Sequence, residues 1–300
     1  MTPLALEALV AALGPRPEGP RAVLVTVEHV QGSAPREAGA WMAVFADRLI
    51  NTLGGGHLEH SAIALARQCL RGGLEADAEA AASGPFTRRF ALGPSLGQCC
   101  GGAVVLRFEP IHGPLHADVR ARLRPRGTPV ALFGGGHVGR ALVRILQTLP
   151  FEVQWVDSRD EIFPPGLPAH VRCEHSDPVQ AAVPDLEPGT HVLIMSFSHA
   201  EDLDIVQACL RRQQTRGDLA FIGLIGSKTK WATFRRRLHE RGFSNQACDR
   251  VTCPIGVPGI AGKEPEVIAV AVAAQLLMVQ AAGSDADRLP GHGAGDTQAG

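Results

Sequence analysis

This sequence contains few lysines and has almost no net charge. Only three of the 29 basic residues are lysines, at positions 228, 230 and 263, and 30 acidic residues leave a formal net charge of -1. A chain without an excess of positive charge lacks the electrostatic footprint of proteins that bind nucleic-acid backbones or anionic membranes. We therefore expect no nucleic acid and no membrane among its partners.

Paired cysteines and long apolar runs are also missing. The seven cysteines include no C-x-x-C pair, the spacing typical of zinc sites, and their odd number without an export signal indicates reduced thiols. The longest apolar segment, 267–282, is interrupted by Gln275 and Gln280 and is shorter than the roughly 20 residues that span a bilayer. The apolar segment 1–13 carries Glu7 and has no basic region of a signal peptide. We expect a cytoplasmic protein without a transmembrane helix.

The length of 300 residues favours two domains over a single hydrophobic core. Residues 1–110 are predicted to form a smaller N-terminal α/β domain. Its predicted elements are strands at 23–27, 41–45 and 103–108 and a helix that follows the glycine-rich segment 53–59 and ends near Leu70. The segment 111–127 has no clear apolar period and is predicted to be the linker, although residues 117–123 could form one or two helical turns.

Residues 128–282 are predicted to form a Rossmann-like domain, a doubly wound parallel sheet in which strands and helices alternate. Its strands are nearly continuous apolar runs, as expected for a sheet covered on both faces. The strands are placed at 130–133, 152–156, 191–196 and 219–225. The helices are placed at 137–149, 201–212, 227–241 and 265–281. The remaining residues, 283–300, are rich in glycine and polar residues and are predicted to form a disordered tail.

A glycine-rich loop follows the first strand of this second domain. Gly134, Gly136 and Gly139 form a G-x-G-x-x-G pattern that contains His137 and opens a helix, and Asp157 ends the next strand. Such glycines permit a tight turn and a close backbone approach, so that helix N–H groups face a phosphate while the acid accepts from a ribose hydroxyl. The pattern predicts that these five residues bind a nucleotide-type ligand. The alternative is a purely structural tight turn.

Two further glycine loops, 223–228 and 256–263, each precede a predicted helix of the same domain. The carboxyl ends of parallel strands meet in one crevice, where a lysine at a helix N-terminus can reach a phosphate as a point charge. The candidates to bind a second anionic group are therefore Gly226, Ser227, Lys228, Gly262 and Lys263. Ordinary helix caps and turns are the alternative. Lys230, two residues further along its helix, is expected to point elsewhere.

No convincing catalytic constellation is present, and no residue is assigned as catalytic. The segment 196–202 offers hydroxyls, an imidazole and carboxylates at a strand end, but it has no G-x-S-x-G elbow and is expected to line the crevice. His57 and Glu59 either cap a glycine turn or face a ligand.

Two adjacent cysteines, Cys99 and Cys100, precede a pair of glycines. Adjacent cysteines cannot easily chelate one tetrahedral metal, and a strand would send their side chains to opposite faces. One interpretation is a small buried apolar residue. The other is an exposed thiol, which suits a soft metal centre or the transfer of persulfide sulfur.

Six motifs occur in an order that is typical of one family. They are Ser33-Ala34-Pro35-Arg36, Gly54-Gly55-Gly56-His57-Leu58-Glu59, Cys100-Gly101-Gly102, Phe133-Gly134-Gly135-Gly136-His137-Val138-Gly139, Ile222-Gly223-Leu224-Ile225-Gly226-Ser227-Lys228 and Cys253-Pro254-Ile255-Gly256. Over roughly residues 20 to 280 the chain resembles the XdhC/CoxI family of molybdenum hydroxylase maturation proteins. Within that family it is most similar to the xanthine dehydrogenase accessory proteins.

The resemblance implies a cytoplasmic, dimer-forming chaperone with no turnover of its own. Such a chaperone binds the molybdopterin form of molybdenum cofactor and protects it while a cysteine desulfurase supplies the terminal sulfur. It then delivers the cofactor to the molybdenum subunit of apo-xanthine dehydrogenase. The resemblance also implies that Cys100 is a candidate contact for molybdenum and leaves the role of Cys99 open. Whether the Rossmann loop holds this cofactor or a separate nucleotide also stays open.

Two other classes of function fit part of the pattern. An NAD(P)-dependent oxidoreductase would show the same glycine loop and acid, although no acid/base pair follows them. A non-catalytic nucleotide sensor would need the loop but would leave Cys100 without a role. Molybdenum with a fluorescent pterin, or NAD(P), carried by the purified protein would distinguish these functions.

Overall fold

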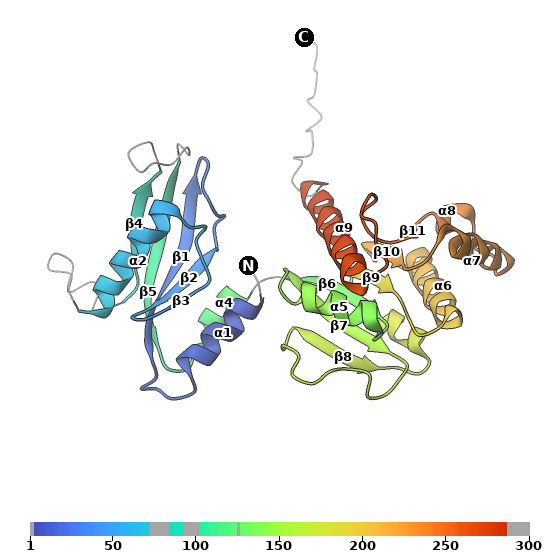
Figure 1. Cartoon of the computed structure of the whole chain (residues 1–300). Coiled ribbons are helices and arrows are strands. Elements are labelled where there is room, and N and C mark those ends of the chain that lie inside the picture. The colour runs from blue at the N-terminus through green and yellow to red at the C-terminus, as the bar shows by residue number, and fades with distance from the viewer. Residues whose placement is uncertain (1–2, 73–83, 93–101, 125–126, 287–300) are drawn as a thin grey trace, which may run out of the picture. The chain divides into compact units, whose positions relative to one another are not determined.

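The computed structural model describes residues 3–72, 84–92, 102–124 and 127–286, and the chain divides into two compact domains between residues 125 and 126 (Figure 1). The predicted α/β class is confirmed. One domain is built on an antiparallel sheet and the other on a parallel sheet, and each has its own hydrophobic core.

The N-terminal domain contains a five-stranded antiparallel sheet in the order β3-β2-β1-β5-β4. The strands are β1 (Arg21–Gln31), β2 (Trp41–Phe45), β3 (Leu49–Ile50), β4 (Phe86–Ala91) and β5 (Ala103–His112). The helices are α1 (Pro3–Leu13), α2 (Gly56–Leu70) and α4 (Ala117–Leu123). Successive residues of a strand point to opposite faces, so Val23 and Val25 pack with α2 whereas Ala22 and Leu24 pack with α1 and α4.

The C-terminal domain contains a six-stranded sheet in the order β11-β10-β9-β6-β7-β8, in which all neighbouring strands are parallel. The strands are β6 (Thr128–Phe133), β7 (Phe151–Asp157), β8 (Val171–His175), β9 (His191–Ile194), β10 (Phe221–Leu224) and β11 (Val251–Thr252). The helices are α5 (His137–Leu146), η2 (Val179–Asp185), α6 (His199–Thr215), α7 (Lys228–Glu240), α8 (Asn245–Cys248) and α9 (Pro265–Ala286). The winding reverses between β6 and β9, which is the switch point where ligands bind in Rossmann folds.

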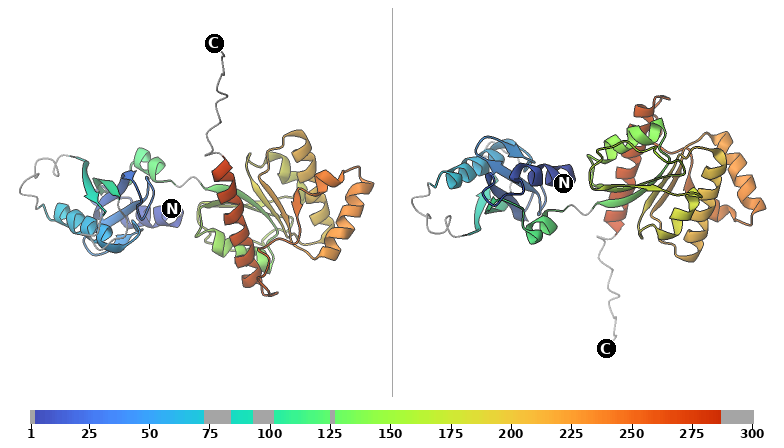
Figure 2. Two further views of the ribbon diagram at one scale, coloured as in Figure 1. Left: turned by 90° about the horizontal axis from the view of Figure 1, so that it is seen from above. Right: turned by 90° about the horizontal axis from the view of Figure 1, so that it is seen from below.

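Helices cover both faces of this parallel sheet (Figure 2). Val130 and Leu132 of β6 pack against α5 and α9, whereas Ala131 and Phe133 pack against η2, α6 and α7. Both faces are therefore buried, which is why the strands are continuous apolar runs rather than alternating ones. The predicted doubly wound sheet is confirmed.

Most of the segment 111–127, which was predicted to be a linker, belongs to the N-terminal domain. β5 continues to His112, and Ile111, Val119 and Leu123 are buried in the core shared with α1. The helical turns considered at 117–123 are present as α4, but a helix of two turns buries too few residues to show a clear apolar period that would assign it to the domain. The prediction also missed β4, β8 and β11, which are short or largely exposed edge strands.

Helix α9 is long and apolar enough to cross a membrane by length and composition alone. In this fold one side of the helix is part of the core, where Ala269, Val272 and Leu276 are buried against α5 and the sheet. The helix ends at Ala286, four residues beyond the predicted end of the domain at 282. The rest of the predicted tail, 287–300, lies outside the described residues.

Candidate functional site

The glycine loop after β6 lies at the switch point of the sheet. Gly134 has a φ of +123°, and a Cβ on it would lie 2.0 Å from the carbonyl oxygen of Met195, just after β9. A Cβ on Gly139 would lie 2.1 Å from the carbonyl oxygen of Gly134, which also accepts a 3.0 Å hydrogen bond from the indole of Trp155. Packing of the loop therefore requires glycine at both positions.

Gly136 differs from the other two glycines of the pattern because the protein itself does not fill the space beside it. It is the N-cap of α5 and supplies no side-chain cap, and a Cβ on it would meet no atom within 4 Å. His137, the first residue of the helix, is exposed. The first-turn N–H groups of a helix have no intrahelical partner, so this open end suits an anion such as a phosphate.

Asp157 has an internal partner in place of the predicted ribose. Its carboxylate is 2% exposed and accepts a hydrogen bond from the amide of Gly135 at 2.5 Å. It also accepts three bonds of 2.9 Å from Arg159, one from the amide and two from the guanidinium. A carboxylate has about four lone-pair positions, so these donors leave none for a ligand hydroxyl. The structure thus uses Asp157 as an internal acceptor, and its predicted contact with a ribose stays a prediction.

The hydrogen bonds also decide the ionisation of Asp157. Burial acts to raise its pKa, but the bonds from Arg159 and Gly135 outweigh burial, and the pKa lies below the ordinary carboxyl value. The carboxylate is charged at neutral pH and holds the guanidinium of Arg159 in one place.

An exposed aromatic ring lies beside this ion pair. Phe197, just after β9, is 67% exposed, and the guanidinium of Arg159 lies over its ring at 4.7 Å from the centroid. Ser158 donates a 2.6 Å hydrogen bond to Glu201 in the first turn of α6, so the segment after β7 is tied to the segment after β9. The segment after β9 therefore carries an exposed aromatic ring beside the Asp157–Arg159 ion pair.

Lys230, which was expected to point elsewhere than the two other lysines, is held inside the domain by an ion pair. Its ammonium donates to the carboxylate of Asp202 at 2.6 Å and to the carbonyl of Ile225 at 2.8 Å, and its side chain is only 11% exposed. The other carboxylate oxygen of Asp202 accepts from the amide and the hydroxyl of Ser196. This ion pair joins the loop that follows β9 to the loop that follows β10.

The two lysines that were predicted to bind an anion are both exposed, and each precedes or begins a helix. Lys228 is the first residue of α7, whose N-cap is Ser227, and the Ser227 hydroxyl accepts from the amide of Lys230 at 3.1 Å. Lys263 precedes α9, and its amide donates to the carboxylate of Glu264 at 3.0 Å.

The glycines beside these lysines are required by packing. A Cβ on Gly226 would lie 2.7 Å from the Lys230 side chain, and one on Gly262 would lie 2.7 Å from Val267. The predicted alternative of a helix cap is thus confirmed for Ser227. The predicted contact of either lysine with an anion stays a prediction.

Three sequence motifs of the N-terminal domain meet at one end of its sheet: the segment 33–36, the glycine loop that begins at Gly54, and Gly102. A Cβ on Gly54 would lie 2.9 Å from the Pro35 side chain, and one on Gly102 would lie 2.5 Å from the carbonyl oxygen of Ser33. Glu59 accepts hydrogen bonds from the amides of Leu53 at 2.7 Å and Gly55 at 3.2 Å, and from the Thr52 hydroxyl. Of the two roles considered for Glu59, the capping of its own glycine turn is confirmed.

The cysteine pair of this domain, Cys99 and Cys100, lies outside the described residues. Burial raises the pKa of all five thiols within the described ranges. The pKa is about 11 for Cys253 and about 12 for Cys209. With a raised pKa these thiols are protonated at neutral pH in the absence of a metal. Across the same ranges, no group of three or more His, Cys, Asp or Glu side chains is arranged to hold a metal ion.

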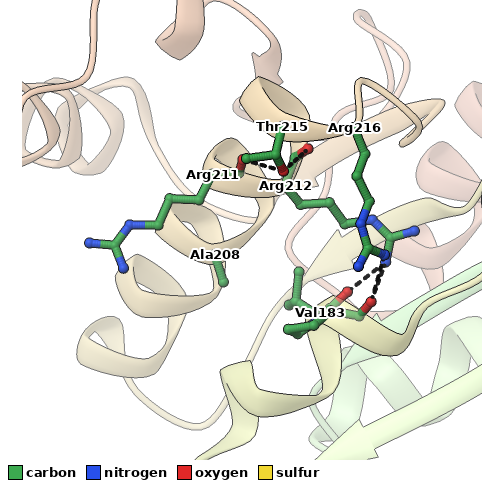
Figure 3. Close-up of a pocket in the computed structure, with 7 residues that line it drawn as sticks. Val183, Ala208, Arg211, Arg212, Thr215 and Arg216 are labelled. Atoms are coloured by element: carbon green, nitrogen blue, oxygen red, sulfur yellow. Dashed lines mark hydrogen bonds between the residues drawn. The ribbon is translucent and has the colours of Figure 1, made fainter.

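A separate pocket of about 310 Å³ lies between η2 and the C-terminal half of α6 (Figure 3). Its wall includes the buried Arg212, which donates to Asp218 and to the carbonyls of Val183 and Leu186. Arg216 donates to the carbonyl of Pro184. The guanidiniums of Arg212 and Arg216 are used to fix the end of η2, so the pocket has a structural explanation.

The sequence patterns predicted the position of the glycine loop. They did not predict the roles of the side chains around it, which are Arg159, Phe197, Asp202 and Lys230. A basic residue two positions after the acid of a Rossmann strand was the available signal for Arg159. No pattern in the sequence marks Lys230, because its partner Asp202 is 28 residues away on another helix.

Comparison with known proteins identifies the family. The model of the XdhC Rossmann domain matches residues 130–276, and the model of the XdhC and CoxI family matches residues 16–77, which together are more than two thirds of the chain. An uncharacterized Escherichia coli K12 protein, YqeB, is 30% identical over 254 residues, covering 83% of this chain but 42% of its own length. The chain thus spans less than half of that relative.

A solved structure supports the fold over both domains. A Bacillus halodurans protein, described as a xanthine dehydrogenase, is 20% identical and superposes with a TM-score of 0.67, covering 94% of this chain and 96% of its own. At this identity the likeness shows the fold alone. With the two family models in the order of the two domains, the chain belongs to the XdhC and CoxI family.

Proposed function

We propose that this protein is a cytoplasmic maturation chaperone that binds molybdenum cofactor and delivers it to apo-xanthine dehydrogenase, with no turnover of its own. In this proposal the cofactor, in its molybdopterin form, is protected during sulfuration by a cysteine desulfurase. The molybdenum subunit of the dehydrogenase then receives it, and the chaperone acts as a homodimer.

The observation that carries the proposal is an open phosphate position without a ribose acceptor. The N-terminus of α5 is unfilled at Gly136, whereas all four donors at Asp157 come from the protein. A dinucleotide needs both a phosphate site and an acceptor for its ribose. Molybdopterin carries a phosphate and no ribose, so it suits a crevice of this kind.

The remaining parts of the proposal concern the metal. A thiolate is the side chain that suits a soft metal centre, and the thiols in the described part of the chain are protonated at neutral pH. Cys100, which precedes two glycines in the family motif, is proposed as the residue that contacts molybdenum. When bound, the cofactor would supply the metal and its sulfur, while this chain would supply the phosphate site and exclude water.

The direct test is the content of the purified full chain. Protein from a cofactor-producing host is expected to carry molybdenum and to release a fluorescent pterin on oxidation. Cys100→Ala is expected to lower the molybdenum content with an unchanged circular dichroism spectrum, and Cys99→Ala is the matched control. Protein that carries NAD(P) instead, or that consumes NAD(P)H with a carbonyl substrate, would favour an oxidoreductase and contradict the proposal.

The exposed lysines give a second test. Lys228→Glu and Lys263→Glu are each expected to weaken cofactor binding at least roughly tenfold, because a charge-assisted contact with the phosphate becomes a repulsion. Titration with released cofactor at two salt concentrations measures the effect. Arg250→Glu is the control, because it reverses an exposed charge at the amino end of β11, whereas the glycine loops follow the carboxyl ends of the strands. If the two lysine variants bind the cofactor as tightly as Arg250→Glu and the wild type do, the lysines are excluded from the site.

A further inference from the structure

Phe197 is an exposed aromatic residue in an informative place. Single exposed apolar residues are common on protein surfaces, so its 67% exposure alone decides nothing. Its position decides more, because it follows β9 at the switch point of the sheet. The preceding residues, Met195 and Ser196, approach Gly134 closely, so the backbone that carries Phe197 lies against the glycine loop that leads into α5.

The ring is supported from one side only. The guanidinium of Arg159 lies over one face at 4.7 Å from the centroid, and this guanidinium is held by two hydrogen bonds of 2.9 Å to the buried carboxylate of Asp157. The large exposed fraction of Phe197 means that the opposite face is open to solvent. A fixed cation behind an open aromatic face is an arrangement that binds a second planar ring.

We infer that Phe197, backed by Arg159, is the stacking surface for the planar nitrogen heterocycle of the ligand whose phosphate lies at the N-terminus of α5. The inference rests on the proposed function, in which this heterocycle is the pterin of molybdenum cofactor. The positive charge behind the ring favours an electron-rich or anionic heterocycle on the open face. Asp157 acts here as a positioning residue, since it holds Arg159 and does not touch the ligand.

Substitution of Phe197 tests the stacking role in the full chain. Stacking on an aromatic side chain is a large part of the affinity for planar ligands, so Phe197→Ala is expected to weaken binding of released molybdenum cofactor about tenfold. Phe197→Leu should lose nearly as much, because it keeps an apolar side chain without a ring. Phe197→Trp should restore binding. Affinity is measured as the fluorescent oxidised pterin that co-elutes with protein across a titration.

A matched control separates stacking from general loss of apolar surface. Met278, on α9, is 63% exposed. It is two residues from Gln280, which donates a hydrogen bond to Thr128 at the amino end of β6, and the glycine loop follows the carboxyl end of this strand. Met278→Ala should bind the cofactor like wild type. Equal affinity of Phe197→Ala and wild type, or equal losses in the leucine and tryptophan variants, would overturn the inference and leave the proposed function standing. A wild-type protein that binds no pterin would overturn both.

Discussion

Replacement of Lys230 by methionine is expected to destabilise the C-terminal domain by about 3 to 5 kcal/mol, because it leaves the buried carboxylate of Asp202 without its counter-charge. Lys230 is 11% exposed and Asp202 is 3% exposed, so water cannot replace the lost partner. The variant also removes the 2.8 Å bond to the carbonyl of Ile225, which leads into the loop before α7. Lys230→Glu should be worse, since it places two carboxylates together.

Urea unfolding of the full chain measures this effect. In a Trp41→Phe background, the fluorescence of Trp155 and Trp231 reports on the C-terminal domain alone. Lys228→Met is the matched control on the same helix, and an exposed side chain of this kind should change stability by less than about 0.5 kcal/mol. In the double variant Lys230→Met with Asp202→Leu, most of the stability should return, since no unpaired charge stays buried. A Lys230→Met variant as stable as its control would mean that the ion pair is not buried in solution.

Replacement of Asp157 by alanine is expected to cost about 3 kcal/mol, because the amides of Gly135 and Arg159 lose their acceptor in a buried place. Cofactor binding should fall as well, since Arg159 is no longer held under Phe197. The same unfolding experiment measures the stability, and Asp160→Ala, a nearby exposed carboxylate, is the control. Unchanged stability with weaker NADH binding would return Asp157 to the role of a ribose acceptor.

The pH dependence of this difference has a defined sign. The pKa of Asp157 in the folded chain is lower than the unfolded value of about 3.9, so its contribution is complete above that value. It is lost as the pH falls through the folded pKa. The stability gap between wild type and Asp157→Ala should therefore be constant near neutral pH and narrow only below about pH 4. A gap that narrows already between pH 5 and 7 would contradict the assignment.

Much of the fold follows from local patterns in the sequence. The strand Trp41–Phe45 was predicted to the residue, the end of α2 was predicted near Leu70, and the parallel sheet followed from apolar runs that alternate with helices. Strand and helix periodicities are properties of neighbouring residues, so a sequence displays them directly. The short helix α4 was considered as one or two helical turns at 117–123, but it was assigned to the linker and not to the N-terminal domain. Its two turns bury only Val119 and Leu123, and their burial comes from contacts with α1 more than a hundred residues away.

The candidate site divides in the same way. The sequence by itself determined where the glycine loop lies, because its spacing between a strand and a helix is local, and its ordered motifs determined the family. Only the tertiary structure decided which charges are used internally. Arg159, two residues from Asp157, supplies three of its four hydrogen bonds, but the fourth comes from Gly135, 22 residues away, and Lys230 is paired with Asp202, 28 residues away. The free energy of a buried charge depends on the partners that folding brings to it, and no local pattern encodes those partners.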